Sequence, residues 1–203
     1  MQIIWARHAE PERVESGTGV PANPPLTRHG REQAARLTAW LALEPVDAVV
    51  SSPQLRARET AAPIADAHGL EVDIVEGLVE YDVQADHYIP VEELRAVKDE
   101  RWVAMVEGRW GEFGGEEPDA FATRVAQAVD DLVVRYRGKS VVAVCHGGVI
   151  NAALASVLGL VRPLWFDPAY TSVSRMLASS SGVRSVQSLN ECAHLYATRE
   201  DTR

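Results

Sequence analysis

Cysteine is scarce in this chain of 203 residues, which contains only Cys145 and Cys192. A small secreted domain held together by disulfide bonds has a far higher cysteine density. We therefore expect both thiols to be reduced. Cys145 ends an apolar run, so we expect it to pack as a small hydrophobic side chain. Nothing in this pair indicates a zinc cage.

Long hydrophobic runs are also missing. No segment approaches the roughly 20 apolar residues that a membrane-spanning helix needs. The chain begins Met1-Gln2-Ile3-Ile4-Trp5-Ala6-Arg7, without the basic start and the apolar stretch of a secretory signal. The expectation is a cytoplasmic protein with no membrane partner.

Positive charge is in deficit, because 20 Lys and Arg residues face 29 Asp and Glu residues and the formal net charge is −9. A general nucleic-acid binder needs clustered cations to neutralise backbone phosphates, so nucleic acid is excluded as a partner. Any phosphate site in this chain must be local. The hydrophobic fraction of 46% and the charged fraction of 24% are ordinary for a soluble globular protein. The length suits one domain over residues 1–203.

Strand patterns alternate with helix patterns along the chain. Short runs rich in Val and Ile predict strands at residues 2–6, 47–51, 72–75, 140–145, 172–178 and 183–189. Apolar residues at helical spacing predict helices at residues 27–43, 55–68, 121–136 and 148–158. Thr27 is the expected N-cap of the first of these helices. This alternation indicates the α/β class: a three-layer α/β/α sandwich with a mostly parallel central sheet.

Residues 81–117 form a long, weakly patterned insertion. Ten Asp and Glu residues outnumber four Lys and Arg residues there. Its part from residue 91 to 106 predicts one or two helices that cover the active end of the sheet as a lid. Five aromatic side chains in the insertion have two readings, packing of the lid onto the sheet or lining of a semi-apolar pocket: Tyr81, Tyr88, Trp102, Trp110 and Phe113.

Cationic side chains follow three of the predicted strands. Arg7 and His8 come after the first strand, Arg56 after the second, and His146 after the fourth. The carboxyl ends of parallel strands meet at one edge of a sheet, where α/β proteins place their chemistry. Arg donates a planar fork of hydrogen bonds to phosphate oxygens. A neutral histidine nitrogen can attack phosphorus when the other ring nitrogen donates a hydrogen bond. The sequence therefore predicts a phosphoryl-binding site.

Competing interpretations accompany these residues. Arg58 is the main rival of Arg56 for the phosphate. Gly147 and Gly148 either permit a tight turn or direct their amides at phosphate from the start of a helix. The remaining histidines are expected to serve helix surfaces, caps, the lid or packing: His29, His68, His87 and His194.

Six blocks carry a resemblance to one family. In chain order they are Arg7-His8-Ala9-Glu10, the Pro-Leu-Thr-Arg-His-Gly run at 25–30, the run from Ser51-Ser52 to Thr60-Ala61, Leu78-Val79-Glu80, His146-Gly147-Gly148, and the closing segment at 189–195. They resemble the signatures of the histidine phosphatase superfamily, branch 1, which includes the cofactor-dependent phosphoglycerate mutases. The resemblance spans nearly the whole chain and implies the phosphoglycerate mutase-like fold.

The resemblance also implies roles for individual residues. His8 would be the nucleophile, Arg7, Arg56 and His146 would hold the phosphoryl group, and Glu80 would protonate the leaving oxygen. A carboxyl group desolvated in a pocket can keep a proton near neutral pH, which suits Glu80. Two arginines and His146 supply the positive charge, so no metal or other cofactor is expected.

The chain departs from the family pattern near the nucleophile. Ala9 replaces the usual glycine, and Val14 stands where relatives often have asparagine. Thr18 is a candidate substitute donor to phosphate. The aromatic and basic run that follows the acid in phosphoglycerate mutases is replaced by Tyr81-Asp82.

Three functions remain open. The leading hypothesis is a metal-independent phosphomonoesterase that acts on a small phosphorylated molecule through a phosphohistidine. The alternatives are a mutase-type phosphotransferase and a non-catalytic module that binds phosphorylated ligands. The acidic insertion disfavours the mutase, because a bisphosphorylated carboxylate would meet repulsion there.

Overall fold

A six-stranded sheet organises the chain in the order β3-β2-β4-β1-β5-β6. The computed structural model describes residues 1–15, 19–162 and 164–196. The strands are β1 (Gln2–Arg7), β2 (Ala48–Ser51), β3 (Val72–Ile74), β4 (Ser140–Cys145), β5 (Val173–Ala178) and β6 (Arg184–Glu191). The first four are parallel neighbours, while β5 runs antiparallel to both β1 and β6. The predicted mostly parallel sheet is confirmed.

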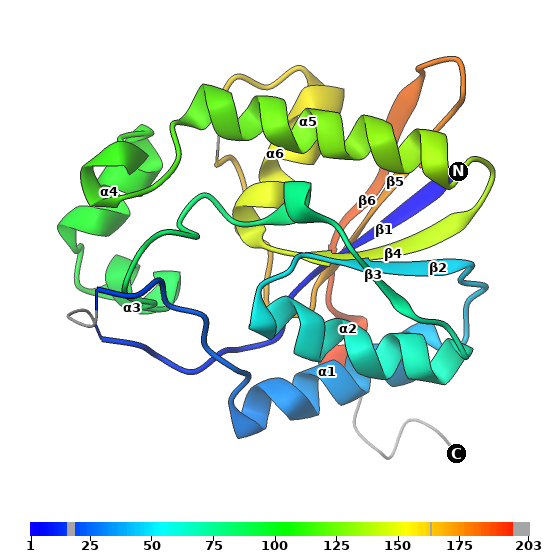
Figure 1. Ribbon diagram of the computed structural model, residues 1–203, viewed down its shortest axis with the longest axis horizontal. Coiled ribbons are helices and arrows are strands. Elements are labelled where there is room, and N and C mark those ends of the chain that lie inside the picture. Colours follow the sequence, from blue (N-terminus) through cyan, green and yellow to red (C-terminus); the bar gives the residue numbers. More distant parts are fainter. Residues whose placement is uncertain (16–18, 163, 197–203) are drawn as a thin grey trace.

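Helices cover both faces of the sheet, which confirms the three-layer α/β/α architecture (Figure 1). One face carries α1 (Arg28–Leu41), α2 (Leu55–His68) and the short α7 (Ala193–Tyr196), and the other carries α5 (Pro118–Arg135) and α6 (Gly147–Leu158). None of the helices in the described part of the chain combines the length and the apolar character that a membrane crossing requires.

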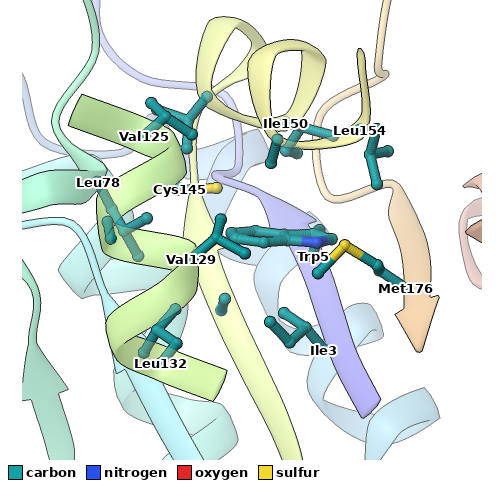
Figure 2. Packing of buried hydrophobic residues seen from close by; sticks show 14 of the residues in the cluster. Ile3, Trp5, Leu78, Val125, Val129, Leu132, Cys145, Ile150, Leu154 and Met176 are labelled. Carbon is teal, nitrogen blue, oxygen red and sulfur yellow. The ribbon is translucent and has the colours of Figure 1, made fainter. Parts of the chain in front are cut away.

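The alternation of side chains along β1 explains why both faces are covered. Ile3 and Trp5 pack with α5 and α6, as Figure 2 shows, whereas Ile4 and Ala6 pack with α1 and α2. Successive residues of a strand point to opposite faces, so a strand that is apolar throughout needs a helical layer on each side. All four of these side chains are fully buried.

Local signals set the ends of the first two helices as predicted. The hydroxyl of Thr27 accepts a hydrogen bond from the Gly30 amide at 2.8 Å, which satisfies one of the free N–H groups of the first turn. Gly69 ends α2 in the left-handed conformation at φ 64°, which a residue without a Cβ adopts at little cost.

The insertion after the acid block contains two short helices, α3 (Val91–Ala96) and α4 (Glu100–Glu107), so the expected helices are confirmed. The single-turn element η1 (Glu76–Leu78) precedes the insertion, and η2 (Trp110–Phe113) lies within it after α4. Backbone hydrogen bonds of 2.9 Å join Val14 and Tyr88 in both directions and tie the insertion to the loop after β1. We call residues 81–117 the lid.

Candidate active site

Three strands, β1, β2 and β4, bring the predicted residues together at the carboxyl edge of the parallel part of the sheet. Arg7 ends β1 and His8 follows it, Arg56 lies in the first turn of α2 after β2, and His146 links β4 to α6. The rings of His8 and His146 are 5.1 Å apart, centroid to centroid. A cavity of about 390 Å³ opens above Arg7, His8 and Arg56.

His8 is held in one tautomer. Its Nδ1 lies 2.8 Å from the carbonyl oxygen of Ala9, and its Nε2 lies 3.3 Å from Nε of Arg56. The guanidinium can only donate, so Nε2 accepts and the ring proton is on Nδ1. Burial and the positive charges of Arg56 and Arg7 lower the pKa of His8 well below its usual range. His8 is therefore neutral near pH 7, with its lone pair on Nε2.

A ring of hydrogen bonds holds this pair in place. The hydroxyl of Thr60 accepts from the Ala9 amide at 3.0 Å and donates to the carbonyl of Arg56 at 2.7 Å. Ala9 thereby connects back to His8, and Arg56 closes the ring through its contact with His8 Nε2. All four residues are buried, so these bonds are shielded from water and maintain the geometry.

Three buried nitrogens around His8 have no hydrogen-bond partner among the described residues: Nε of Arg7, Nη1 of Arg56 and Nδ1 of His146. Buried donors are normally satisfied, and an unsatisfied one costs free energy. His146 Nε2 lies 2.8 Å from the Ser52 hydroxyl, which accounts for its other ring nitrogen. The arrangement suits an anion with several acceptor oxygens.

A tyrosine ring covers each arginine. The guanidinium carbon of Arg7 is 4.0 Å from the ring centroid of Tyr170, and that of Arg56 is 4.6 Å from the ring centroid of Tyr88. Cation–π contact of this kind favours the charged guanidinium and orients its plane. Tyr170 comes from the segment before β5 and Tyr88 from the lid, so two separate segments of the chain hold the arginines at the floor of the cavity.

Glu80 lies at the site, two residues after the end of η1. Its carboxyl group accepts hydrogen bonds from two backbone amides. Oε2 lies 2.8 Å from the Gly148 nitrogen and Oε1 lies 3.2 Å from the Tyr81 nitrogen. Burial, followed by the nearby negative charge of Asp82, raises the pKa of Glu80 to about 7. A carboxyl group with this pKa is an acid in one half of a reaction and a base in the other near neutral pH.

The structure distinguishes between the two interpretations of Gly148 at the helix start. The Gly148 amide does not face phosphate, because it donates to Glu80. A Cβ at this position would lie 2.3 Å from Glu80 Oε1, so glycine is required there to admit the carboxyl group. Gly147 lines the cavity beside Arg7, and its phosphate contact stays a prediction.

The loop at 164–168 forms the wall opposite the lid, and Asn151 of α6 holds it. Oδ1 of Asn151 accepts from the amides of Trp165 and Phe166 at 2.9 and 3.1 Å, while Nδ2 donates to the carbonyls of Gly147 and Phe166 at 2.9 and 3.0 Å. Both donor hydrogens and both acceptor lone pairs of this buried side-chain amide therefore make hydrogen bonds. The carbonyl of Pro168 in turn accepts from Arg7 Nη1 at 2.6 Å.

The lid aromatics serve both of the expected purposes. Trp110 stacks on Tyr81 at 4.3 Å between ring centroids and meets Phe121 of α5 edge-on, so it packs the lid onto the body. All five lid aromatics also line the cavity, where Trp165 and Phe166 join them from the opposite wall.

The acidic excess of the lid faces the cavity less than its composition suggests. Among the lid carboxylates, Asp82 lines the cavity, with Oδ1 at 3.9 Å from Arg56 Nη2. Several of the others pair with arginines outside the cavity lining, as Glu93 does with Arg13, but Glu92 lies 3.7 Å from Nη1 of Arg7 and Asp99 pairs with Arg101 of the lining. The lid's negative charge is therefore only partly neutralised away from the cavity.

The remaining candidates occupy the following places. Arg58 is exposed on α2, whereas Arg56 is buried at the site, so the structure favours Arg56 over its rival. His29 is exposed on α1, while His194 is buried and stacks on Trp40, 4.7 Å between ring centroids. Thr18 lies outside the described residues.

The other predicted packing and lid residues agree with their expected roles. Cys145 belongs to the hydrophobic core, and burial raises the pKa of its thiol well above its usual range. His68 stands in the last turn of α2, and His87 belongs to the lid and lines the cavity.

Comparisons with known proteins agree with this geometry. Residues 3–191 match the family model described as histidine phosphatase superfamily (branch 1). A bifunctional protein of Mycobacterium tuberculosis is 31% identical over 206 aligned positions, which cover 96% of this chain and 55% of that protein. The chain thus spans about half the length of that curated relative.

Two further relatives are matched along most of their length. Phosphoserine phosphatase 1 of Hydrogenobacter thermophilus is 32% identical over 166 residues, covering 79% of this chain and 77% of that protein. A solved phosphoserine phosphatase of Entamoeba histolytica, in complex with 3-phosphoglyceric acid, superposes with a TM-score of 0.73 at 25% identity and covers 96% of this chain and 98% of its own.

Proposed function

The chain belongs to the histidine phosphatase superfamily (branch 1), and from this premise we propose that it is a metal-independent phosphomonoesterase with a phosphohistidine intermediate at His8. The observation that carries the proposal is the set of three unpartnered buried nitrogens around His8 Nε2: Arg7 Nε, Arg56 Nη1 and His146 Nδ1. The relative from Hydrogenobacter thermophilus is named as a phosphatase, which supports the reaction class.

In the first step, the lone pair on His8 Nε2 forms a bond to phosphorus while the bond from phosphorus to the ester oxygen breaks. The carboxyl proton of Glu80 goes to the departing oxygen, since an alkoxide is a poor leaving group without it. Arg7, Arg56 and His146 stabilise the charge on the three remaining phosphoryl oxygens. Because two fixed guanidinium groups and the His146 ring do this, a divalent ion has no necessary task in the step.

In the second step, a water molecule attacks phosphorus and gives its proton to the Glu80 carboxylate. The bond from phosphorus to Nε2 breaks, and the electron pair returns to the ring nitrogen. The hydrogen bond from Nδ1 to the Ala9 carbonyl keeps the proton on Nδ1 throughout, so the ring returns to its starting tautomer. Inorganic phosphate and the alcohol are the products.

The cavity supports a substrate with an apolar body. A volume of about 390 Å³, lined by aromatic side chains from the lid and from the opposite loop, is in the range that holds a small organic molecule. We therefore propose a small phosphomonoester that places its phosphoryl group on the arginines and its body between Trp102 and Trp165.

The test is to trap the intermediate. A ³²P-labelled alkyl monophosphate is mixed with the protein and quenched in alkali, where a phosphorus–nitrogen bond survives. We expect label on the wild-type chain and on His29→Ala, which removes an exposed histidine, and no label and no turnover in His8→Ala. Label that persists in His8→Ala would overturn the proposal.

The same experiment separates the alternatives. Free phosphate released in water supports the phosphatase, whereas label transferred to an added phosphorylated acceptor supports a phosphotransferase. Binding without label and without turnover would indicate a phospho-ligand-binding module.

A further inference from the structure

Gln54 occupies the N-cap of α2 but does not cap the helix with its side chain. An N-cap side chain usually accepts a hydrogen bond from an amide in the first helical turn. The Gln54 side chain is buried, at 5% exposure, and its Oε1 accepts instead from the backbone nitrogen of Glu80 at 2.9 Å. The bond spans 26 residues of sequence.

Another residue performs the capping that Gln54 omits. The side-chain oxygen of Asn23, in the loop before α1, accepts from the Leu55 amide at 2.7 Å. The first amide of α2 is therefore satisfied without Gln54. Because Asn23 caps the helix, the side-chain amide of Gln54 is available to bind Glu80.

The position of Glu80 is defined from three sides. Its backbone nitrogen is bound by Gln54, its Oε2 by the Gly148 amide and its Oε1 by the Tyr81 amide. Gly148 and Tyr81 act on the carboxyl group itself. Gln54 is the one side chain among these three contacts, and it connects Glu80 to the helix that carries Arg56.

The same residue also meets the support of His146. The backbone nitrogen of Gln54 donates to the Ser52 hydroxyl at 3.4 Å, and this hydroxyl lies 2.8 Å from His146 Nε2. Gln54 is thus placed between the acid and the phosphate-binding histidine, on the segment that joins β2 to α2.

We propose that Gln54 is a positioning residue for the general acid: by holding the backbone of Glu80 against the start of α2, it sets the distance between the Glu80 carboxyl and the ester oxygen above Arg56. This inference rests on the proposed function, in which Glu80 protonates the leaving group. A displacement of a catalytic group by about 1 Å can lower a rate by about 100-fold. The effect should appear only where the departing oxygen needs a proton.

The experiment compares an alkyl monophosphate with 4-nitrophenyl phosphate, whose oxygen departs without a proton. Gln54→Leu removes the acceptor at nearly constant volume. We expect kcat for the alkyl ester to fall about 10- to 100-fold, kcat for the aryl ester to fall by no more than about 3-fold, and KM to stay within about 2-fold for both. Gln54→Glu keeps an acceptor oxygen at the same place and should recover most of the alkyl-ester rate.

A double-variant cycle gives the stricter test. If Gln54 acts through Glu80, Gln54→Leu should cost little more in a Glu80→Gln background, because the acid is already absent. Losses that multiply, or equal losses for alkyl and aryl esters, would overturn the inference. Thermal unfolding of each variant identifies a folding defect, and Gln54→Met then repeats the test.

Asn23→Ala is the matched control, since it removes the other side chain that binds the start of α2. We expect this variant to lower kcat equally for the alkyl and the aryl ester, because a displaced α2 moves Arg56, which serves both. The Glu80→Gln single variant separates the two proposals. If it shows no loss specific to the alkyl ester, the proposed role of Glu80 fails. If it shows such a loss and Gln54→Leu does not, only the positioning role of Gln54 is overturned.

Discussion

The floor of the cavity and its lid are built in opposite ways. His8, Arg56 and Glu80 are between 1% and 7% exposed and are joined to strand ends by buried hydrogen bonds. The lid helix α3 has no buried residue, and in α4 Ala104 is the buried one. Trp110 anchors the end of the lid, whereas its two helices meet the body through surface ion pairs such as that of Arg95 with Asp167, which are individually weak.

This difference assigns different tasks to the two regions. Buried, mutually bonded groups keep a reacting geometry with little reorganisation, which is what phosphoryl transfer requires of the floor. A weakly held roof with a mixed apolar and charged lining suits the choice of substrate and its entry. Changes at His8 and Arg56 should therefore alter kcat for every substrate, changes at Glu80 should alter kcat for esters with poor leaving groups, and changes in the lid should alter KM in a way that depends on the body of the substrate.

The largest effect is expected from Arg56, the arginine beside His8. Arg56→Lys removes the Nε donor to His8 and the planar fork, so kcat/KM should fall about 100- to 1,000-fold for all esters. Arg58→Lys, two residues along α2 and exposed, should stay within about 2-fold. Steady-state kinetics of both variants provide the check; comparable losses would mean that the floor has been misassigned.

The next effect concerns the acid and its pH dependence. The pKa of Glu80 is raised to about 7 and that of His8 is well below its usual range. His8 is thus neutral and Glu80 protonated from mildly acidic pH up to about 7, so kcat for an alkyl ester should decline above about pH 7. Glu80→Gln should abolish that decline and lower the alkyl rate about 100-fold, with a much smaller loss for aryl esters. An unchanged pH profile in this variant would argue against Glu80.

Glu80 should also affect stability: the group that is needed for activity lowers the free energy of unfolding as the pH rises. Its folded pKa of about 7 exceeds the ordinary 4.5, so its contribution is intact below about pH 4.5 and is lost as pH rises to about 7. The loss is on the order of 3 kcal/mol. Calorimetry should therefore show that the Tm of Glu80→Gln, compared with the Tm of wild type at the same pH, is more favourable at pH 8 than at pH 4.5.

A smaller effect is expected from the lid. Trp102→Ala should raise KM about 10-fold for an ester with an aromatic body and leave kcat for a short alkyl ester nearly unchanged. For wild type we expect neutral monoesters to exceed 3-phosphoglycerate and fructose 2,6-bisphosphate in kcat/KM, because apolar side chains line the cavity and Asp82 and Asp167 lie beside the arginines. If the polyanions win, Arg95, Arg101 and Arg162 in the cavity lining are the groups that recognise them.

The smallest effect is expected from chelation. Arginines already supply the charge in the floor, so activity after treatment with EDTA should stay within about 2-fold of the untreated enzyme. Activity lost to EDTA and restored by a divalent ion would contradict the proposed mechanism.

The sheet could be predicted from sequence because its signals are local. Val- and Ile-rich runs placed all six strands to within about two residues at most boundaries, and the Thr27 cap and the Gly69 terminus depend on neighbours within one helical turn. Arg7, His8, Arg56 and His146 could be grouped because each follows a strand, and parallel strands bring those positions to one edge.

What sequence could not show depends on partners far along the chain. The sequence left the use of the Gly148 amide open because its acceptor, Glu80, lies 68 residues away, in the segment after η1. Gln54 gave no signal, since glutamine is not a favoured N-cap and its partner is 26 residues away. Tyr170 and Asn151 stand in a loop and in an apolar helix, where nothing in the local pattern distinguishes them.

The bonds that Asn151 makes to the 164–168 loop have a consequence for how the chain could diversify. Its side-chain amide reaches only main-chain atoms of Trp165 and Phe166, so those bonds do not depend on which side chains the two positions carry. Mutation there can change the shape of the cavity wall while the backbone, and with it the Pro168 carbonyl that orients Arg7, stays where it is. Substitutions at these two positions can therefore alter specificity while the Asn151 side chain continues to hold the main chain of the loop.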